Sequence, residues 1–180
     1  MRYSSFKRIR ASLLSLILTI ATWLSFSTLA TASPTHSLHP PLMALFSFSG
    51  TRPNNLGVQN GALAACPDSP NCVNSFSTDA EHKIDPIRYT SAPEKAFADL
   101  KKTIQAMPQT QIVTENENYL YAEFASKLMG FVDDVEFYLD KTAGVIHVRS
   151  ASRLGKSDLG VNRQRVEAIR AALAGNVASA

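Results

Sequence analysis

FVDDVEFYLDKTAGVIHVRSAS, residues 131–152, contains two runs of alternating apolar and polar residues on either side of a turn. Such alternation predicts two antiparallel strands that form a hairpin. If Leu139 pairs with Ile146, Glu136 lies directly opposite Arg149 on the other face, where the opposite charges support the pairing. A slip of one residue would bury charged side chains, so the pattern favours this register.

The sequence before and after this hairpin predicts two more strands and two helices. Residues 111–115 and 118–126 also alternate with a period of two, whereas residues 91–107 and 162–174 repeat apolar side chains every three or four positions. The expected helix boundaries are Ser91 and Asn162 as N-caps and Gly175 just beyond the second helix. We therefore expect an α+β fold, a two-layer sandwich of a four-stranded antiparallel sheet with two helices on one face.

The N-terminus has the three parts of a secretory signal. Four basic residues lie within residues 1–10, an apolar run follows, and Ala30-Thr31-Ala32 fits a cleavage site with small residues. We expect residues 1–32 to be a cleaved signal peptide, residues 33–60 a loosely structured lead-in, residues 61–175 one α+β domain and residues 176–180 a tail. The alternative is an uncleaved anchor, since about 20 apolar residues can span a bilayer.

The charge of the chain changes when this signal is removed. The whole chain has 18 basic and 15 acidic residues, and loss of the four basic residues in the signal leaves 14 basic against the same 15 acidic. A nearly neutral mature protein gives no reason to expect nucleic acid or an anionic membrane as partner. The localisation that we expect is export to the periplasm, or to the thylakoid lumen in a photosynthetic organism.

The only two cysteines, Cys66 and Cys72, lie in the turn-rich stretch CPDSPNCVNS. Disulfides persist in oxidising compartments, so a small structural cystine loop is the favoured interpretation. A redox-active pair is the alternative, although redox motifs are usually C-x-x-C before a helix. Two cysteines without a nearby histidine pair would make at most half of a zinc site, so no metal is expected.

Polar residues are densest in the hairpin and in the loop after it. Arginine suits the recognition of carboxylate or phosphate, so this region is a candidate site for a small anion. In that hypothesis Arg149, Arg153 and Arg163 contact the anion, and three acids orient them. The complete candidate set is Arg149, Ser150, Ser152, Arg153, Asp158, Asn162, Arg163, Asp133, Asp134 and Glu136. The competing interpretation, which the balance of charges favours, is a salt-bridge network that attaches the last helix to the sheet.

Catalysis has weaker support. Asp134, Glu136 and His147 share one face of the hairpin and could form a hydrolytic site, but Arg149 opposite Glu136 favours a salt bridge. Asp133 and Asp134 point to opposite faces because they are neighbours in a strand. The sequence lacks the usual hydrolase, zinc-protease, P-loop and dinucleotide motifs, so we expect no cofactor and favour a protein that is not an enzyme.

Three stretches resemble the family of uncharacterised proteins named domain of unknown function 1499, which occurs in bacteria and chloroplasts. They are CPDSPNCVNS, FVDDVEFYLD and VRSASRLGKSDLGVNRQRVEAIR. The resemblance covers roughly residues 48–173 and implies an exported or lumenal setting, but no activity. The charge cluster and the lack of catalytic motifs suggest an accessory or assembly factor that binds a protein segment or a small anionic ligand. The alternatives are a small hydrolase and a thiol-disulfide redox protein, and the oligomeric state stays open.

Overall fold

In the computed structural model of the protein, residues 48–178 are described, with side chains up to residue 175. The expected signal peptide, residues 1–32, lies outside the described residues, as do residues 33–47 of the expected lead-in. No helix within residues 48–178 is both long enough and apolar enough to cross a membrane.

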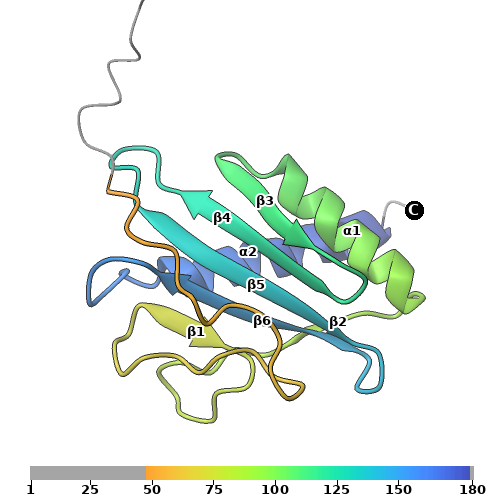
Figure 1. The fold of residues 1–180 in the computed structure, drawn as a ribbon. Helices are drawn as coiled ribbons and strands as arrows, with labels where there is room; N and C mark the ends of the chain where they lie inside the picture. The colour runs from red at the N-terminus through yellow and green to blue at the C-terminus, as the bar shows by residue number, and fades with distance from the viewer. Residues whose placement is uncertain (1–47, 179–180) are drawn as a thin grey trace, which may run out of the picture. The chain divides into compact units, whose positions relative to one another are not determined.

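The fold is α+β, with one antiparallel sheet and two helices (Figure 1). The sheet has six strands: β1 Cys72–Asn74, β2 Ile87–Arg88, β3 Thr110–Glu115, β4 Tyr119–Ala125, β5 Val132–Asp140 and β6 Val145–Ser152. Its order is β1-β6-β5-β4-β3, and β2 pairs with β6 beside β1. The expected four strands are therefore present as β3 to β6, but the four-stranded sheet was wrong. The added strands, β1 and β2, have three and two residues, too few to show a period in the sequence.

The register of the central hairpin is confirmed. Glu136 lies opposite Arg149, and Leu139 lies opposite Ile146. The turn depends on Asp140, whose carboxylate accepts hydrogen bonds from two successive backbone N–H groups of the turn, and on Gly144, whose φ of 67° suits glycine. The alternation of the sequence and the chemistry of the turn thus select the same pairing.

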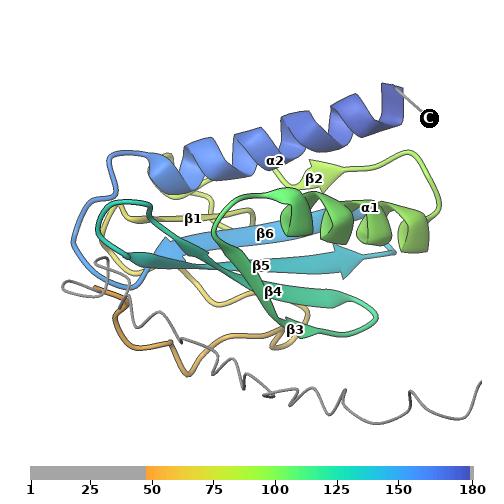
Figure 2. The same cartoon turned by 90° about the horizontal axis from the view of Figure 1, so that it is seen from above.

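Both helices cover one face of the sheet, as Figure 2 shows. Helix α1, Pro93–Ala106, buries Leu100 and Ile104, and helix α2, Val161–Ala178, buries Val166 and Ile169. These side chains form one hydrophobic core with the apolar side chains of β4, β5 and β6. The expected apolar stripes of both helices are confirmed.

The expected helix ends were wrong in three places. Helix α1 begins at Pro93, and its N-cap is Ala92 rather than Ser91, because a residue before proline is held in extended conformation. Helix α2 begins one residue before Asn162, whose backbone N–H is instead accepted by the Asp158 carboxylate at 2.7 Å. The helix also continues through the glycine at position 175, which does not adopt the positive φ of a helix terminus.

Residues 48–64 lie against the other face of the sheet, opposite the helices (orange in Figure 2). Leu56, Val58 and Leu63 pack there against Tyr119 and Tyr121 of β4. The described part of the lead-in therefore covers the face that carries Asp134, Glu136 and Arg149.

Candidate functional site

Glu136 is the centre of a buried polar network between the sheet and the lead-in. Its side chain is fully buried, and its Oε1 accepts hydrogen bonds from the Tyr119 hydroxyl at 2.8 Å and the Gly57 backbone N–H at 2.7 Å. Its Oε2 accepts one from Arg149 Nη1 at 3.2 Å. Arg149 is 5% exposed, and its Nε has no hydrogen-bond partner among the described residues. Burial, together with Glu136, raises the pKa of the Tyr119 hydroxyl, so it stays a donor.

Arg153 is the centre of a second group on the same face. Its Nε donates to both Asp134 oxygens, at 3.1 and 3.0 Å, and its Nη2 donates to Asp134, Glu123 and the Tyr121 hydroxyl. These bonds, first that with Asp134, raise the pKa of Arg153. Burial alone would raise the pKa of Glu123, but hydrogen bonds from Arg153, Arg52 and Tyr121 lower it further than burial raises it. The charges of this group are thus balanced internally.

The remaining candidates lie on the helix-covered face or beside it. Asp133 forms an ion pair with Arg165 of α2. Asn162 is fully buried: its Oδ1 accepts from Ser150 at 2.6 Å, and its Nδ2 donates to Ser152 at 3.0 Å and to Asp158 at 2.8 Å. These bonds fasten the start of α2 to β6. Asp133 and Asp134 do point to opposite faces, as predicted.

Arg163 lies apart from both groups. Its guanidinium donates to the backbone carbonyls of Lys83 at 2.7 Å and Glu81 at 2.9 Å. The structure therefore does not bring Arg149, Arg153 and Arg163 together around one anion. It divides the ten candidate residues among the Glu136 network, the Arg153 group, the start of α2 and this loop contact.

The three residues of the hydrolase hypothesis are also separate in their contacts. Asp134 and Glu136 share a face, but their partners are arginines and tyrosines. His147 instead shares a 3.0 Å hydrogen bond with Ser75 Oγ and stacks on the Phe76 ring, with centroids 3.9 Å apart. Burial lowers the pKa of His147. Among the described residues, the carboxylate within ion-pair distance of this histidine is that of Asp140, at 4.0 Å, and not that of Asp134 or Glu136.

Cys66 and Cys72 form a disulfide, with Cα atoms 5.7 Å apart, so the cystine prediction is confirmed. The loop that it closes docks on the segment after β6, because Asn71 Nδ2 donates to the Gly155 carbonyl at 2.7 Å. Within residues 48–175 no three side chains of the metal-binding types gather as a metal site would require.

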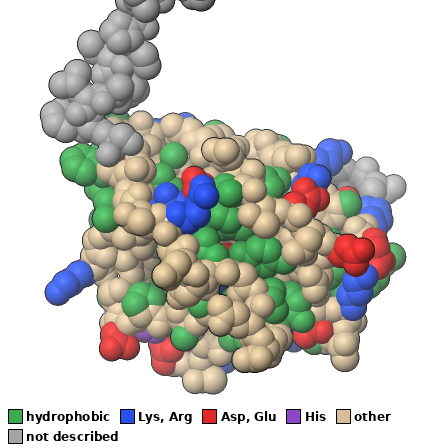
Figure 3. Space-filling view, in the orientation of Figure 1, with side chains coloured by type: hydrophobic (Ala, Val, Ile, Leu, Met, Phe, Trp, Pro, Cys, Tyr) green, Lys and Arg blue, Asp and Glu red, His purple; other side chains and the backbone are tan. Residues whose placement is uncertain are grey.

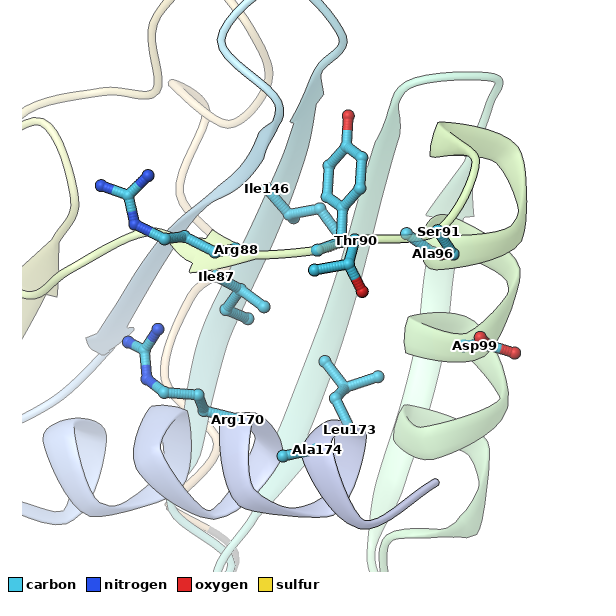
Figure 4. A pocket seen from close by; sticks show the side chains of 11 residues that line it. Ile87, Arg88, Thr90, Ser91, Ala96, Asp99, Ile146, Arg170, Leu173 and Ala174 are labelled. Atoms are coloured by element: carbon cyan, nitrogen blue, oxygen red, sulfur yellow. The ribbon is translucent and has the colours of Figure 1, made fainter. Parts of the chain in front are cut away.

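A cavity that the sequence did not indicate lies between β2, α1 and α2 (Figure 4). Its volume is about 300 Å³, and its walls include Ile87, Ile146 and Leu173. Such a volume is at the lower limit of ligand sites, roughly 300–1,000 Å³. The lining residues come from three distant segments, 87–99, residue 146 and 170–174, so no local motif could have predicted the cavity.

The rim of this cavity carries two arginines on one side and Asp99 on the other. Arg88 is exposed and has no ion pair or side-chain hydrogen bond among the described residues. Arg170 donates to the carbonyls of Pro86 and Asp85, at 2.9 and 2.7 Å, and pairs with Glu167. In Figure 4 the two guanidinium groups extend to the same side of the cavity. Tyr89 also lines it, and its buried hydroxyl has no hydrogen-bond partner in the described part of the chain.

Comparison with known proteins identifies the family. The family model for a protein of unknown function (DUF1499) matches residues 62–173, which include all six strands and most of both helices. The chain therefore belongs to this family. No curated protein and no solved structure matches it significantly.

Proposed function

We propose that this DUF1499 domain is a non-catalytic binding protein, and that its ligand is a small amphipathic carboxylate held in the cavity between β2, α1 and α2. The observation that carries the proposal is the unpaired cation of Arg88 at the rim of a mainly apolar cavity. Ligand sites typically combine an apolar lining with few oriented polar groups. An alkyl carboxylate has this same combination.

The arginine cluster suggested by the sequence is the weaker site. Arg149 is paired with Glu136, and Arg153 is paired with Asp134 and Glu123. An incoming anion would have to displace these acids from buried positions, leaving them without a partner. Ion-pair networks that stabilise a fold imitate anion sites in this way.

The two ends of the ligand would meet different parts of the cavity. The apolar chain would contact Ile87, Ile146 and Leu173, while the carboxylate would accept hydrogen bonds from Arg88. The guanidinium of Arg170 already donates to two carbonyls and to Glu167, so it would contribute charge rather than new hydrogen bonds. The proposed specificity is therefore for one anionic group and a short apolar chain.

Calorimetric titration with octanoate tests the proposal. We expect the protein to bind octanoate more tightly than octanol. Arg88→Gln should lower the affinity for octanoate about fivefold, because an exposed ion pair contributes about 1 kcal/mol. Lys102→Gln removes an exposed charge from α1 outside the cavity and should leave the affinity for octanoate unchanged. Ala174→Phe adds a ring at an exposed position in the cavity wall and should abolish binding. Absence of binding to the wild type, or unchanged binding to Ala174→Phe, would refute the proposal.

We further propose that the protein acts outside the cytoplasm, in the periplasm or a thylakoid lumen, as an accessory factor. The disulfide between Cys66 and Cys72 supports an oxidising compartment, and the N-terminal sequence has the pattern of a secretory signal. The mass of the denatured protein, isolated from its own cells, should correspond to a chain that begins at Ser33 and lacks two hydrogens. A full-length reduced chain would contradict this localisation.

A further inference from the structure

One end of the domain collects exposed apolar side chains. Eight large hydrophobic side chains are exposed within residues 48–175, and seven of these lie in three segments, 48, 128–131 and 154–161. The seven are Phe48, Leu128, Met129, Phe131, Leu154, Leu159 and Val161. We call them the apolar tip. A contiguous apolar surface on a folded protein usually marks an interaction site.

The three segments lie side by side. The Phe48 ring stacks on Phe131, with centroids 5.6 Å apart, and the Phe48 backbone N–H donates to the Met129 carbonyl at 3.3 Å. Phe131, Leu154 and Val161 line one hollow of about 210 Å³. Figure 1 shows the β4–β5 and β6–α2 loops at the end where the described chain begins, and Figure 3 shows hydrophobic side chains there.

Two leucines project from this surface rather than lining it. Leu128 is 92% exposed and Leu159 is 89% exposed, at the turns of two different loops. Leu159 also has a φ of 55°, a conformation in which a bulky residue is unusual and asparagine or glycine is favoured. The positive φ and the exposure to water both disfavour leucine at position 159. The Leu159 side chain is therefore suited to a contact with another molecule.

The exposed charges around the leucines are positive. Lys127 and Lys156 are both exposed, and neither has an ion pair within residues 48–175. Of the acids in these loops, Asp133 is buried against Arg165, and Asp158 is half-buried, with a carboxylate that accepts from the backbone N–H groups of Gly160 and Asn162. Apolar side chains that extend beyond a pair of lysines match the acyl layer and the anionic headgroups of a membrane.

We infer that the apolar tip inserts into the surface of an anionic membrane, a partner that the net charge of the mature chain gave no reason to expect. The leucines project from two separate turns, which suits a fluid acyl layer, whereas a protein partner would need two matching pockets. The sequence before the described chain continues the apolar character, with Leu42, Met43 and Leu45. Figure 1 places the β6–α2 loop, which carries part of the apolar tip, at the opposite end of β6 from β2, so insertion of the apolar tip would leave the proposed ligand cavity open to water.

Flotation with lipid vesicles tests this inference, using the protein as isolated so that every variant has the same N-terminus. The probe is phosphatidylcholine vesicles with and without about one-third phosphatidylglycerol. Leu128→Ser and Leu159→Asn should each weaken binding about tenfold, and the pair about hundredfold if the effects add. Phe76→Ser removes the eighth exposed side chain, away from the apolar tip, and should leave binding unchanged.

Two further measurements separate the membrane from other partners. Lys127→Gln with Lys156→Gln should weaken binding to the anionic vesicles about thirtyfold and leave binding to neutral vesicles unaffected. Inorganic phosphate should not compete, which distinguishes a lipid surface from a free anion. Leu159→Asn should also raise the midpoint of thermal unfolding by about 2–4 °C because it relieves the backbone strain.

Three results would overturn the inference. The first is that the wild type does not bind vesicles, and the second is that the variant with both Leu128→Ser and Leu159→Asn binds them as tightly as the wild type. The third is that the wild type is a dimer that does not bind vesicles and that the same double variant is a monomer. The last would assign the apolar tip to self-association. Because Ala174→Phe leaves the apolar tip intact, vesicle binding should survive in that variant, so the two proposals can fail independently.

Discussion

Glu136→Gln distinguishes a structural network from a ligand site. Glu136 Oε1 accepts from two donors, Gly57 N–H and Tyr119 O–H, and Oε2 accepts from Arg149. A glutamine has one oxygen and one NH₂ group, so either the buried arginine or the two neutral donors lose their acceptor. Removing one partner of a buried ion pair typically costs about 3–5 kcal/mol. Because the amide oxygen of the glutamine can still accept some of these hydrogen bonds, we expect Glu136→Gln to lower the free energy of unfolding by about 3 kcal/mol, the lower end of this range.

The assay is urea unfolding followed by circular dichroism, with a double-mutant cycle. Arg149→Met should also cost about 3 kcal/mol, and the double variant with Glu136→Gln should cost less than the sum by about 2 kcal/mol. Glu94→Gln is the matched control, because its ion pair with Lys141 is exposed and should contribute less than about 1 kcal/mol. Domains of this kind are stable by about 5–15 kcal/mol, so the difference is measurable.

The reasoning would be refuted if Glu136→Gln cost no more than Glu94→Gln, or if it stabilised the protein. Gains in stability on removing a buried charge are typical of residues that are kept for function at the expense of stability. Either result would favour the anion site that the sequence suggested over the structural network. A loss near 3 kcal/mol with unchanged octanoate binding would support the structural role of Glu136.

The remaining predictions concern the disulfide and two histidines, His82, which is buried, and His147, which is half-buried. Replacing Cys66 and Cys72 by serine should lower the free energy of unfolding by about 2–2.5 kcal/mol, the loop-closure entropy of so short a loop, in the same urea assay. Burial lowers the pKa of His82, but its bonds with Asp79 and the Ser69 carbonyl raise it more. Its stabilisation is therefore complete below the unfolded pKa of about 6.5 and lost as pH rises through the folded pKa, so His82→Gln should cost more at pH 5 than at pH 8. The pKa of His147 is lowered by burial, so His147→Gln should show the opposite trend. Equal costs at both pH values for either variant would contradict the corresponding sign.

Local patterns predicted the central strands because alternation and turn chemistry act over a few neighbouring residues. The pairing of Glu136 with Arg149 followed from the apolar residues on the opposite face. The helix stripes followed in the same way from the spacing of Leu100 and Ile104. The start of α1 did not, because Pro93 constrains the residue before it and moves the cap away from Ser91.

The candidate site was harder to predict than the fold. The arginines and acids are close in sequence, but the sheet separates them: Asp133 faces α2, whereas Asp134 faces the lead-in. Nothing local indicated that Gly57 would donate a hydrogen bond to Glu136 across 79 positions of the chain. The choice among several possible charge partners depends on which surfaces the fold brings together.

The sequence by itself determined the α+β class, the register of β5 with β6, the family and the cystine loop. These depend on periodicity, spacing and motif, which are properties of short segments. Only the tertiary structure decided that β1 and β2 extend the sheet, that Arg153 pairs with Asp134 and Glu123, and that a cavity opens beside Arg88. Burial and ion pairing are long-range outcomes, because each depends on segments that meet only when the chain has folded.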